Sequence, residues 1–362
     1  MTSAIPEELA YTASPEILAG RVADAVKPTE TSGQVRSVRT DRYEDHDITV
    51  TSVHEVIVDG VPVDVRLTVD DAGMVHSPGL PYRRFTSALE AVRALISAHR
   101  GPVFLAWHRM MLLYLEGQCQ GVLGSNGVSD KTFGLPYWDW SVDGDDGSSP
   151  TAPIWQPTSV GGQGMPVSDG PFAYRPGDPN SFAVRIESAY DGKPSQADGG
   201  QGRGLMRHFG SGWKVLPTGA DVKNALAFGP SGPTPNPGDR YDVLTYSIAS
   251  DGFRGRLEGW TPNPDPNRAR PWLHNQVHAW IGGDMSPASS PNDPVFFLHH
   301  CNVDRIRESW LQRYNRVYAP DGTASDYYSG ERIDDALDNA GFSTSIRTML
   351  DRREYYAYDV LP

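Results

Sequence analysis

The sequence predicts a mainly α protein that is preceded by a small α+β unit. Two histidines four residues apart, His274 and His278, fit one face of a helix. Apolar residues alternate with a period of two from Ile48 to Val69, as in strands, and then recur at helical spacing from Phe85 to Ile96. These changes predict a polar segment over residues 1–40, an α+β domain over residues 41–98 and a helical domain over residues 99–362.

Composition limits the classes of partner. The 362-residue chain has a formal net charge of −13 and a pI near 5.2, which argue against nucleic acid and anionic membranes. No apolar run reaches the roughly 18 residues of a membrane-spanning helix. The N-terminus lacks the basic start and apolar stretch of a signal peptide, so we expect a cytoplasmic protein and leave export by another route open. Cys119 and Cys301 make no disulfide framework, and we expect small buried side chains.

The α+β domain is expected to begin with a hairpin. Asp59-Gly60 offers a two-residue turn between the alternating Val56 and Val58 and the alternating run from Val61 to Val69. The apolar residues from Phe85 onward then predict a helix over residues 84–98. Residues 1–40 are polar and weakly patterned, and Glu16 to Val26 could form a short helix.

The helical domain alternates helices with long loops. Leu135 to Trp140 is rich in aromatic residues and is expected in the core. Residues 141–270 are rich in Gly, Pro, Asp and Ser, and two stretches, Asp191 to Gly204 and Gly229 to Asp239, are expected to be surface loops.

The pair His274 and His278 is a candidate metal site. Two imidazoles one helical turn apart can bind one ion, and neutral imidazole suits copper, zinc, iron and nickel. A third histidine from the segment Asp293 to Asp304 would complete a three-nitrogen site. The alternative is a helix with two surface histidines, which an isolated His-x-x-x-His favours.

Two longer motifs support the metal site. His99 to Glu116 reads His-x4-Phe-Leu-x-Trp-His-Arg-x2-Leu-x3-Glu, and Asp293 to Asp304 reads Asp-Pro-x-Phe-Phe-x2-His-x3-Asp. They resemble the first and second copper signatures of the tyrosinase family. The resemblance implies a type 3 binuclear copper centre in a four-helix bundle. By position it assigns His99 and His108 to copper A, and the copper B ligands are His274, His278 and His300.

The resemblance leaves copper A incomplete. The family's first copper A histidine has no counterpart on the predicted helix over residues 84–98. His299 aligns with a residue that is not a ligand, and His208 falls where relatives have none. His76, His46 and His54 remain as sixth ligands, with His76 favoured because it lies nearest and in a loop.

Two further residues gain roles from the resemblance, and a third gains one from its position on the helix. Glu258 and Asn275 match a pair that holds a water near copper B, and that water is thought to accept the proton of an incoming phenol. Asp304, four residues beyond His300, is a candidate to orient that ligand. The alternative for Asp304 is a salt bridge with Arg305 or Arg307.

The predicted α+β domain resembles the caddie, or copper-chaperone, partner of actinobacterial tyrosinases. The pattern runs from Glu55 to Gly60, through a loop with His and Tyr, to Ser87–Ala94. It implies a built-in cover over the copper site, with Tyr82 at the pocket. An unrelated hairpin and helix, with Tyr82 packed beside Pro81, is the alternative.

The sequence therefore predicts an oxidase or monooxygenase with two copper ions that uses O2 on phenols, o-diphenols or o-aminophenols. The alternatives are a copper- or O2-binding protein without turnover, and an enzyme in which only copper B is competent. The physiological phenol, the balance between monophenol and diphenol oxidation, and the oligomeric state stay open.

Overall fold

A computed structural model gives the fold of this chain. It describes residues 35–43, 46–54, 56–58, 61–63, 68–69, 75–76, 87–89, 102–128, 133–178, 180–184, 202–212, 214–227, 241–242, 252–259, 273–286, 290–324, 331–339 and 342–362.

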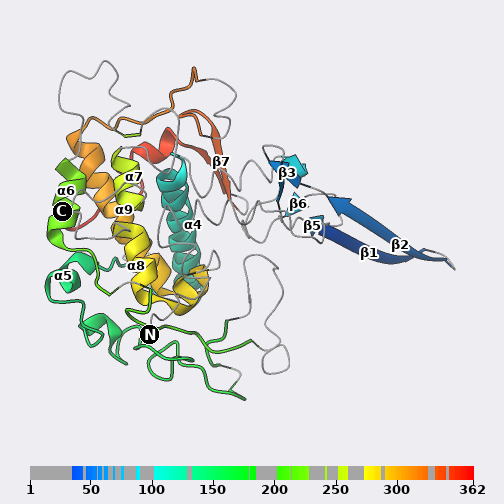
Figure 1. Ribbon diagram of the computed structural model, residues 1–362, viewed down its shortest axis with the longest axis horizontal. Helices are drawn as coiled ribbons and strands as arrows, with labels where there is room; N and C mark the ends of the chain where they lie inside the picture. The colour runs from blue at the N-terminus through cyan, green and yellow to red at the C-terminus, as the bar shows by residue number, and fades with distance from the viewer. Residues whose placement is uncertain are drawn as a thin grey trace.

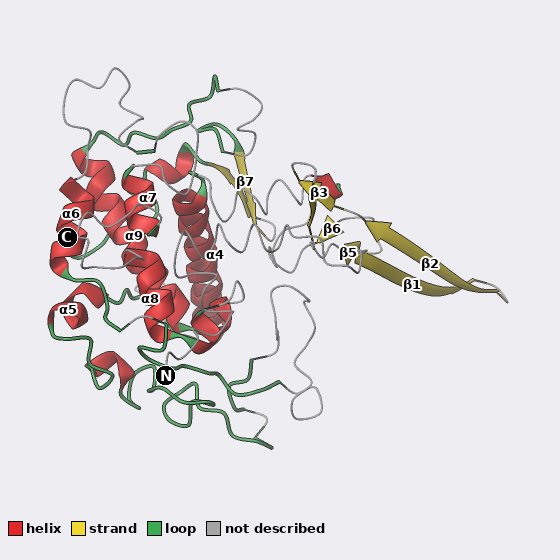
Figure 2. Cartoon of the chain, in the orientation of Figure 1, coloured by secondary structure: helices red, strands yellow, loops and turns green. Residues whose placement is uncertain are grey.

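The described part of the helical domain is built mainly from α-helices (Figures 1 and 2). They are α4 (Phe104–Ser125), α5 (Trp140–Asp145), α6 (Gly219–Ala227), α7 (Phe253–Glu258), α8 (Leu273–Ile281) and α9 (Val295–Arg313). Short 3-10 turns lie at η2 (Pro153–Trp155), η5 (Gly283–Met285), η6 (Ser290–Asn292) and η8 (Thr348–Leu350). The expected mainly α class is confirmed.

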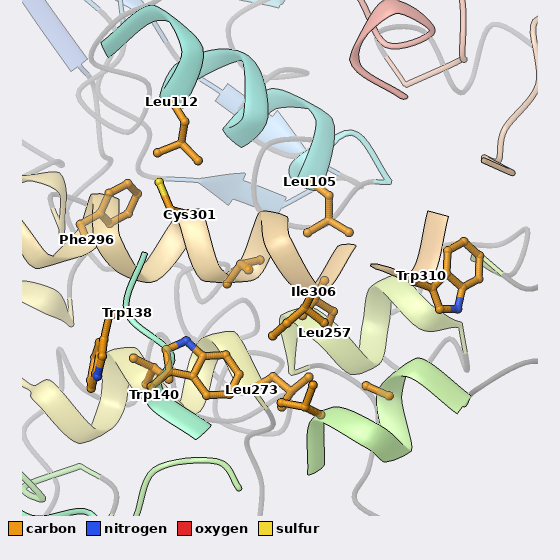
Figure 3. Close-up of a cluster of buried hydrophobic side chains, with 14 of the residues drawn as sticks. Leu105, Leu112, Trp138, Trp140, Leu257, Leu273, Phe296, Cys301, Ile306 and Trp310 are labelled. Carbon is orange, nitrogen blue, oxygen red and sulfur yellow. The ribbon is translucent and has the colours of Figure 1, made fainter. Parts of the chain in front are cut away.

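Helix α9 packs against α4 on one side and against α8 on another. Leu105 and Leu112 of α4 face Cys301 and Ile306 of α9 across an apolar interface (Figure 3). Trp138 and Trp140 are also buried in this core, as expected for the aromatic segment. The helix expected over residues 84–98 is described only at residues 87–89, of which Ala88 and Leu89 are helical. The packing of α4, α8 and α9 therefore brings both copper signatures onto one core.

The strands pair two by two, all antiparallel. They are β1 (Val35–Tyr43) with β2 (His46–His54), β3 (Val56–Val58) with β4 (Val61–Val63), β5 (Thr68–Val69) with β6 (Val75–His76), and β7 (Ala336–Asn339) with β8 (Phe342–Ser345). Figure 1 places β1 to β6 outside the helical body.

The hairpin expected at Asp59-Gly60 is confirmed, because β3 and β4 pair on either side of that turn. Two expectations are wrong: His76 ends strand β6 instead of lying in a loop, and a predicted strand is divided. The run from Val61 to Val69 is not one strand, since β4 ends at Val63 and β5 begins at Thr68. Residues 35–43 form β1 although they are polar. A two-stranded pair need not bury a face, so it needs no strict apolar alternation.

Several expectations fall outside the described residues, including most of the loop from Asp191 to Gly204 and all of the one from Gly229 to Asp239. The domain limits at residues 40 and 98 stay predictions. Cys301 is buried and Cys119 half-buried, and both are free thiols. No described helix has both the length and the apolar character that a membrane crossing requires.

Candidate metal centre

Three imidazoles from two helices converge on one point. We call His274 and His278 of α8 and His300 of α9 the histidine triad; all three side chains are buried. Their Nε2 atoms form a triangle with separations of 3.0 Å between His278 and His274, 3.3 Å between His274 and His300 and 3.4 Å between His278 and His300. The expected i, i+4 pair and the second signature are therefore brought together.

Hydrogen bonds turn two of these rings so that Nε2 points inward. The Nδ1 of His278 donates to the carbonyl oxygen of Met285 at 2.6 Å, and the Nδ1 of His274 bonds the Asn275 side-chain oxygen at 2.8 Å. A ring whose Nδ1 carries the proton keeps its lone pair on Nε2. The Met285 carbonyl comes back to His278 through a turn at Gly283, where an added Cβ would lie 2.2 Å from the backbone oxygen of Met206. Only glycine fits there.

The third ring is held by stacking. The His300 ring lies 4.0 Å from the Phe296 ring and 4.2 Å from the His108 ring, measured between centroids, and is close to parallel with both. Its Nδ1 is buried and makes no hydrogen bond to any described residue. The apolar Phe296 of the second signature therefore holds a candidate ligand that has no polar anchor among the described residues.

Burial keeps the triad neutral. It lowers the pKa of His274 and of His300 well below the usual histidine value, and neighbouring histidines add to this effect. The pKa of His278 is lowered by burial to about 4, against the opposing effect of the Met285 hydrogen bond. At neutral pH all three rings therefore present unprotonated lone pairs, the form that binds a metal ion.

The donor set fits a transition metal. Three lone pairs that face one another without protons between them repel, and a cation at the centre removes that repulsion. Three nitrogens about 2.0–2.1 Å from one ion in a common plane would lie roughly 3.5 Å apart. The triad separations of 3.0 to 3.4 Å come close to that geometry. Imidazole nitrogens are ligands that copper accepts.

His299 lies with the triad. One ring nitrogen from each of His274, His278, His299 and His300 falls within 4.8 Å of the others. The family resemblance excluded His299 as a ligand, because it aligns with a residue that does not bind copper. Sequence alone gave no sign that its ring would turn toward the metal centre.

The copper A side is described only in part. His108 lies on α4, half-buried, with its Nδ1 bonded to the Phe104 carbonyl at 2.9 Å. Its ring stacks on His300, which brings the two signatures into contact. His99 and Tyr82 fall outside the described residues, as do the side chains of His76, His46 and His54. These assignments stay predictions.

The expected water-holding pair lies at the junction of α7 and α8, which pack together. Glu258, the last residue of α7, is buried and accepts a hydrogen bond from Arg254 at 3.0 Å. Asn275 is buried beside His274, and its Nδ2 makes no hydrogen bond to any described residue. A buried amide N–H aimed at no described partner is a donor available for a water or a substrate.

Asp304 was expected to orient His300, but its carboxylate instead bonds Arg109 and two tyrosine hydroxyls. Its Oδ1 accepts from Arg109 Nε at 2.7 Å, and its Oδ2 accepts from the hydroxyls of Tyr356 and, at 2.8 Å, Tyr358. These partners occupy the carboxylate. The alternative, a salt bridge along the helix, is confirmed for Arg307, whose Nη1 lies 3.7 Å from Asp304 Oδ1.

A second carboxylate joins Asp304 between the helices. Glu308 accepts from Arg109 Nη2 at 3.0 Å. The expected alternative partner of Asp304, Arg305, instead pairs with Asp139 at 2.8 Å. We call Arg109, Asp304, Glu308, Tyr356 and Tyr358 the α4–α9 junction.

Burial alone would raise the pKa of Asp304, but Arg109 and Arg307 lower it below its ordinary value. The carboxylate is therefore ionised at neutral pH. Arg109 directly follows His108, and Asp304 is one turn beyond His300, so the α4–α9 junction ties together the two helices that carry these candidate ligands.

Comparisons with known proteins agree with this geometry. The family description "common central domain of tyrosinase" matches residues 66–313. The chain is 34% identical to the tyrosinase of Streptomyces antibioticus and 35% identical to that of Streptomyces glaucescens, in each case over 73% of this chain and 81% of the relative. It is also 33% identical to the grixazone synthase of Streptomyces griseus, over 72% of this chain and 81% of that protein. This chain belongs to the tyrosinase family.

Proposed function

We propose that this protein is a copper-dependent oxidase that uses O2 to convert phenols, o-diphenols or o-aminophenols to o-quinone-type products. The convergence of the three buried Nε2 atoms of the histidine triad carries this proposal. Bound copper supplies the site for O2 and takes up the electrons that the phenol loses. Relatives named as tyrosinases and a synthase support turnover over copper or O2 binding alone.

The protein's own part is to hold and shield the site. The carbonyl of Met285 and the side chain of Asn275 fix two rings of the triad, and the stack on Phe296 fixes the third. Burial of these rings excludes water, which strengthens every polar interaction with a bound substrate.

For copper A we propose His99, His108 and His76. The Nδ1 of His108 is bonded to the Phe104 carbonyl, which leaves its Nε2 lone pair for a metal. The family match begins at residue 66, so it includes both His76 and His99. That range favours His76 over His46 and His54, which precede it.

Metal analysis tests both sites. We expect about two copper ions per reconstituted chain, and His278→Ala should lower this toward one and abolish phenol oxidation, because two imidazoles bind far more weakly than three. The matched control is His208→Ala, since His208 is exposed and outside the cluster. Wild-type copper and activity in His278→Ala would refute the triad assignment. In His76→Ala, retention of both ions would exclude His76.

We also propose that Glu258 and Asn275 position a water that takes the proton of an incoming monophenol. The buried carboxylate and the available Asn275 Nδ2–H support this role, because a general base needs a group that holds it in place. Asn275→Ala should then slow monophenol turnover by about 10²-fold or more, in the range of general-base effects, and diphenol turnover much less. Equal losses on both substrates would mean that Asn275 only anchors His274.

The segment over residues 41–98 is proposed as a cover over the copper site. Strands β1 to β4 precede the family match at residue 66, which is consistent with an added unit in front of the common domain. A tethered cover acts at high effective concentration, so it suppresses turnover without tight affinity. Tyr82→Ala, or cleavage within residues 70–80, should raise turnover of bulky phenols; loss of copper instead would make the segment part of the core.

A further inference from the structure

The segment over residues 203–210 lies against the end of α8, and we call it the strap. Its backbone amides at His208 and Gly210 donate to the carbonyl oxygens of Ile281 and Trp280, at 2.9 and 2.7 Å. These carbonyls belong to the last turn of α8, where the helix itself offers no donor. The strap therefore completes the end of the helix that carries two members of the histidine triad.

The strap also holds the turn that anchors His278. The amide of Asp284 donates to the Met206 carbonyl at 2.8 Å, and the amide of Met206 donates to the Asp284 carboxylate at 2.8 Å. Both Nη atoms of Arg203 bond the same carboxylate, at 2.9 and 2.6 Å. Asp284 directly precedes Met285, whose carbonyl oxygen bonds the Nδ1 of His278. The strap is therefore attached to the peptide that orients this ring.

Arg207 links the strap to α9. Its side chain is buried, and its Nε and Nη2 each donate to one carboxylate oxygen of Asp293 at 2.7 Å. The Oδ1 of Asp293 also accepts from the amide of Val295, the first residue of α9, at 3.0 Å. The Nη1 of Arg207 donates to the carbonyls of Val160 and Gly161, at 2.9 and 3.0 Å. A two-point contact of this kind fixes direction as well as distance.

We propose that Arg207 is a positioning residue that sets the separation of His278 and His300. The inference rests on the proposed metal site at the triad. On the α8 side the strap is attached beside Met285, the anchor of His278. On the α9 side Arg207 is attached through Asp293 to the first turn of the helix that carries His300. Both attachments belong to one short segment, so losing Arg207 lets one candidate ligand move relative to the other.

Two variants separate the effect of position from that of charge. Arg207→Met alone leaves the buried carboxylate of Asp293 without this cation, and that carboxylate acts on His278, whose pKa it raises against the effect of burial. The double variant Arg207→Met/Asp293→Asn removes both charges and keeps an oxygen that accepts from the Val295 amide. In urea unfolding of the copper-free proteins, we therefore expect the double variant to lie much nearer the parent than Arg207→Met does.

The decisive measurement is copper binding at the triad. In a His108→Phe background, which removes a proposed copper A donor, one equivalent of Cu²⁺ is added to copper-free protein. Adding the double substitution to this parent should weaken Cu²⁺ binding about 10- to 100-fold and change the copper hyperfine coupling in the EPR spectrum, because the nitrogens lose their relative placement. Arg347→Met, which breaks an exposed ion pair with Asp334, is the control and should change neither.

Parent affinity and a parent EPR spectrum in the double variant would overturn the proposal, because Arg207 would then only neutralise a buried carboxylate. If the double variant does not fold, Arg207→Lys takes its place, since lysine keeps the charge but lacks the planar fork. Weaker copper binding in Arg207→Lys would support the proposal, and parent binding would overturn it. Failure of the triad itself appears separately, as copper retained by His278→Ala.

Discussion

Helix α9 contacts its two neighbours in opposite ways. Toward α8 it presents the neutral imidazole of His300, whose Nε2 lies 3.3 Å from that of His274 and 3.4 Å from that of His278. Toward α4, at the α4–α9 junction, it presents two carboxylates that are both bonded to Arg109. The first contact brings together neutral donors that suit a metal ion, and the second contains its own cation, the Arg109 guanidinium.

The difference shows how the fold supports a metal site. The triad rings are held from outside the site, two by hydrogen bonds at Nδ1 and the third by its stack on Phe296. The α4–α9 junction lies one turn beyond His300 and directly after His108, where it fixes α4 against α9. We call the buried charges of the α4–α9 junction the frame, because they fix the two helices. The neutral histidines of the triad form the candidate metal site.

The largest effect is expected at the frame. Asp304→Ala leaves the guanidinium of Arg109 buried with Glu308 as its remaining charged partner among the described residues, and breaking a buried pair in this way typically costs about 3–5 kcal/mol. Urea unfolding of the copper-free protein measures this loss. The control is Asp334→Ala, which removes an exposed ion pair with Arg347 and should cost about 0–1 kcal/mol. Equal effects of the two substitutions would contradict the proposed role of the junction.

At the histidine triad, the expected change in stability depends on whether copper is bound. Copper in excess of its dissociation constant by about 100-fold should stabilise the parent by about 2.7 kcal/mol, provided that the unfolded chain does not bind it. His300→Phe should remove much of this copper-dependent gain while changing the copper-free stability little, because Phe replaces an imidazole that stacks between two rings. Thermal unfolding with and without copper measures both. A large loss in the copper-free protein would mean that the triad also belongs to the frame.

Acid should weaken the frame. Burial raises the pKa of Asp304, but the opposing effect of Arg109 and Arg307 is larger, so the pKa is lowered overall. A carboxylate whose folded pKa is depressed contributes stability above its unfolded pKa of about 3.9, and this is lost as pH falls through the folded pKa. The copper-free parent should therefore lose stability below about pH 4, and Asp304→Asn should flatten that slope. An unchanged slope in the variant would mean that other carboxylates carry the acid sensitivity.

Residues that repeat with the helical period were predictable. His274 and His278 follow from their i, i+4 spacing and His108 and His300 from the two longer motifs, and the hairpin at Asp59-Gly60 follows from its turn. What the sequence did not predict depends on partners that are remote or have no side-chain signal. Asp304 pairs with Arg109, which is 195 positions away, and the anchor of His278 is a backbone carbonyl. Strand β1 was missed because a two-stranded pair needs no apolar face.

The smallest expected loss of stability comes from removing one tyrosine hydroxyl of the α4–α9 junction while its charged side chains remain. The Tyr358 hydroxyl lies 2.8 Å from the carboxylate of Asp304 and 3.1 Å from the carbonyl of Cys301, the residue after His300. Tyr358→Phe keeps the ring and removes these contacts, and the loss of one hydrogen bond of this kind costs about 0.5–1.5 kcal/mol. Tyr355→Phe is the control, because that ring is 42% exposed.

Comparing the stability lost in Tyr358→Phe with that lost in Asp304→Ala shows whether the tyrosines or the ion pair hold α4 against α9. In Tyr358→Phe the ion pair with Arg109 remains, and Tyr356 still donates to the same carboxylate oxygen. Copper content should therefore stay at the parent value while urea unfolding shifts slightly. A loss as large as that of Asp304→Ala, or a loss of copper, would place the frame in the C-terminal tyrosines, with the buried ion pair serving only to position them.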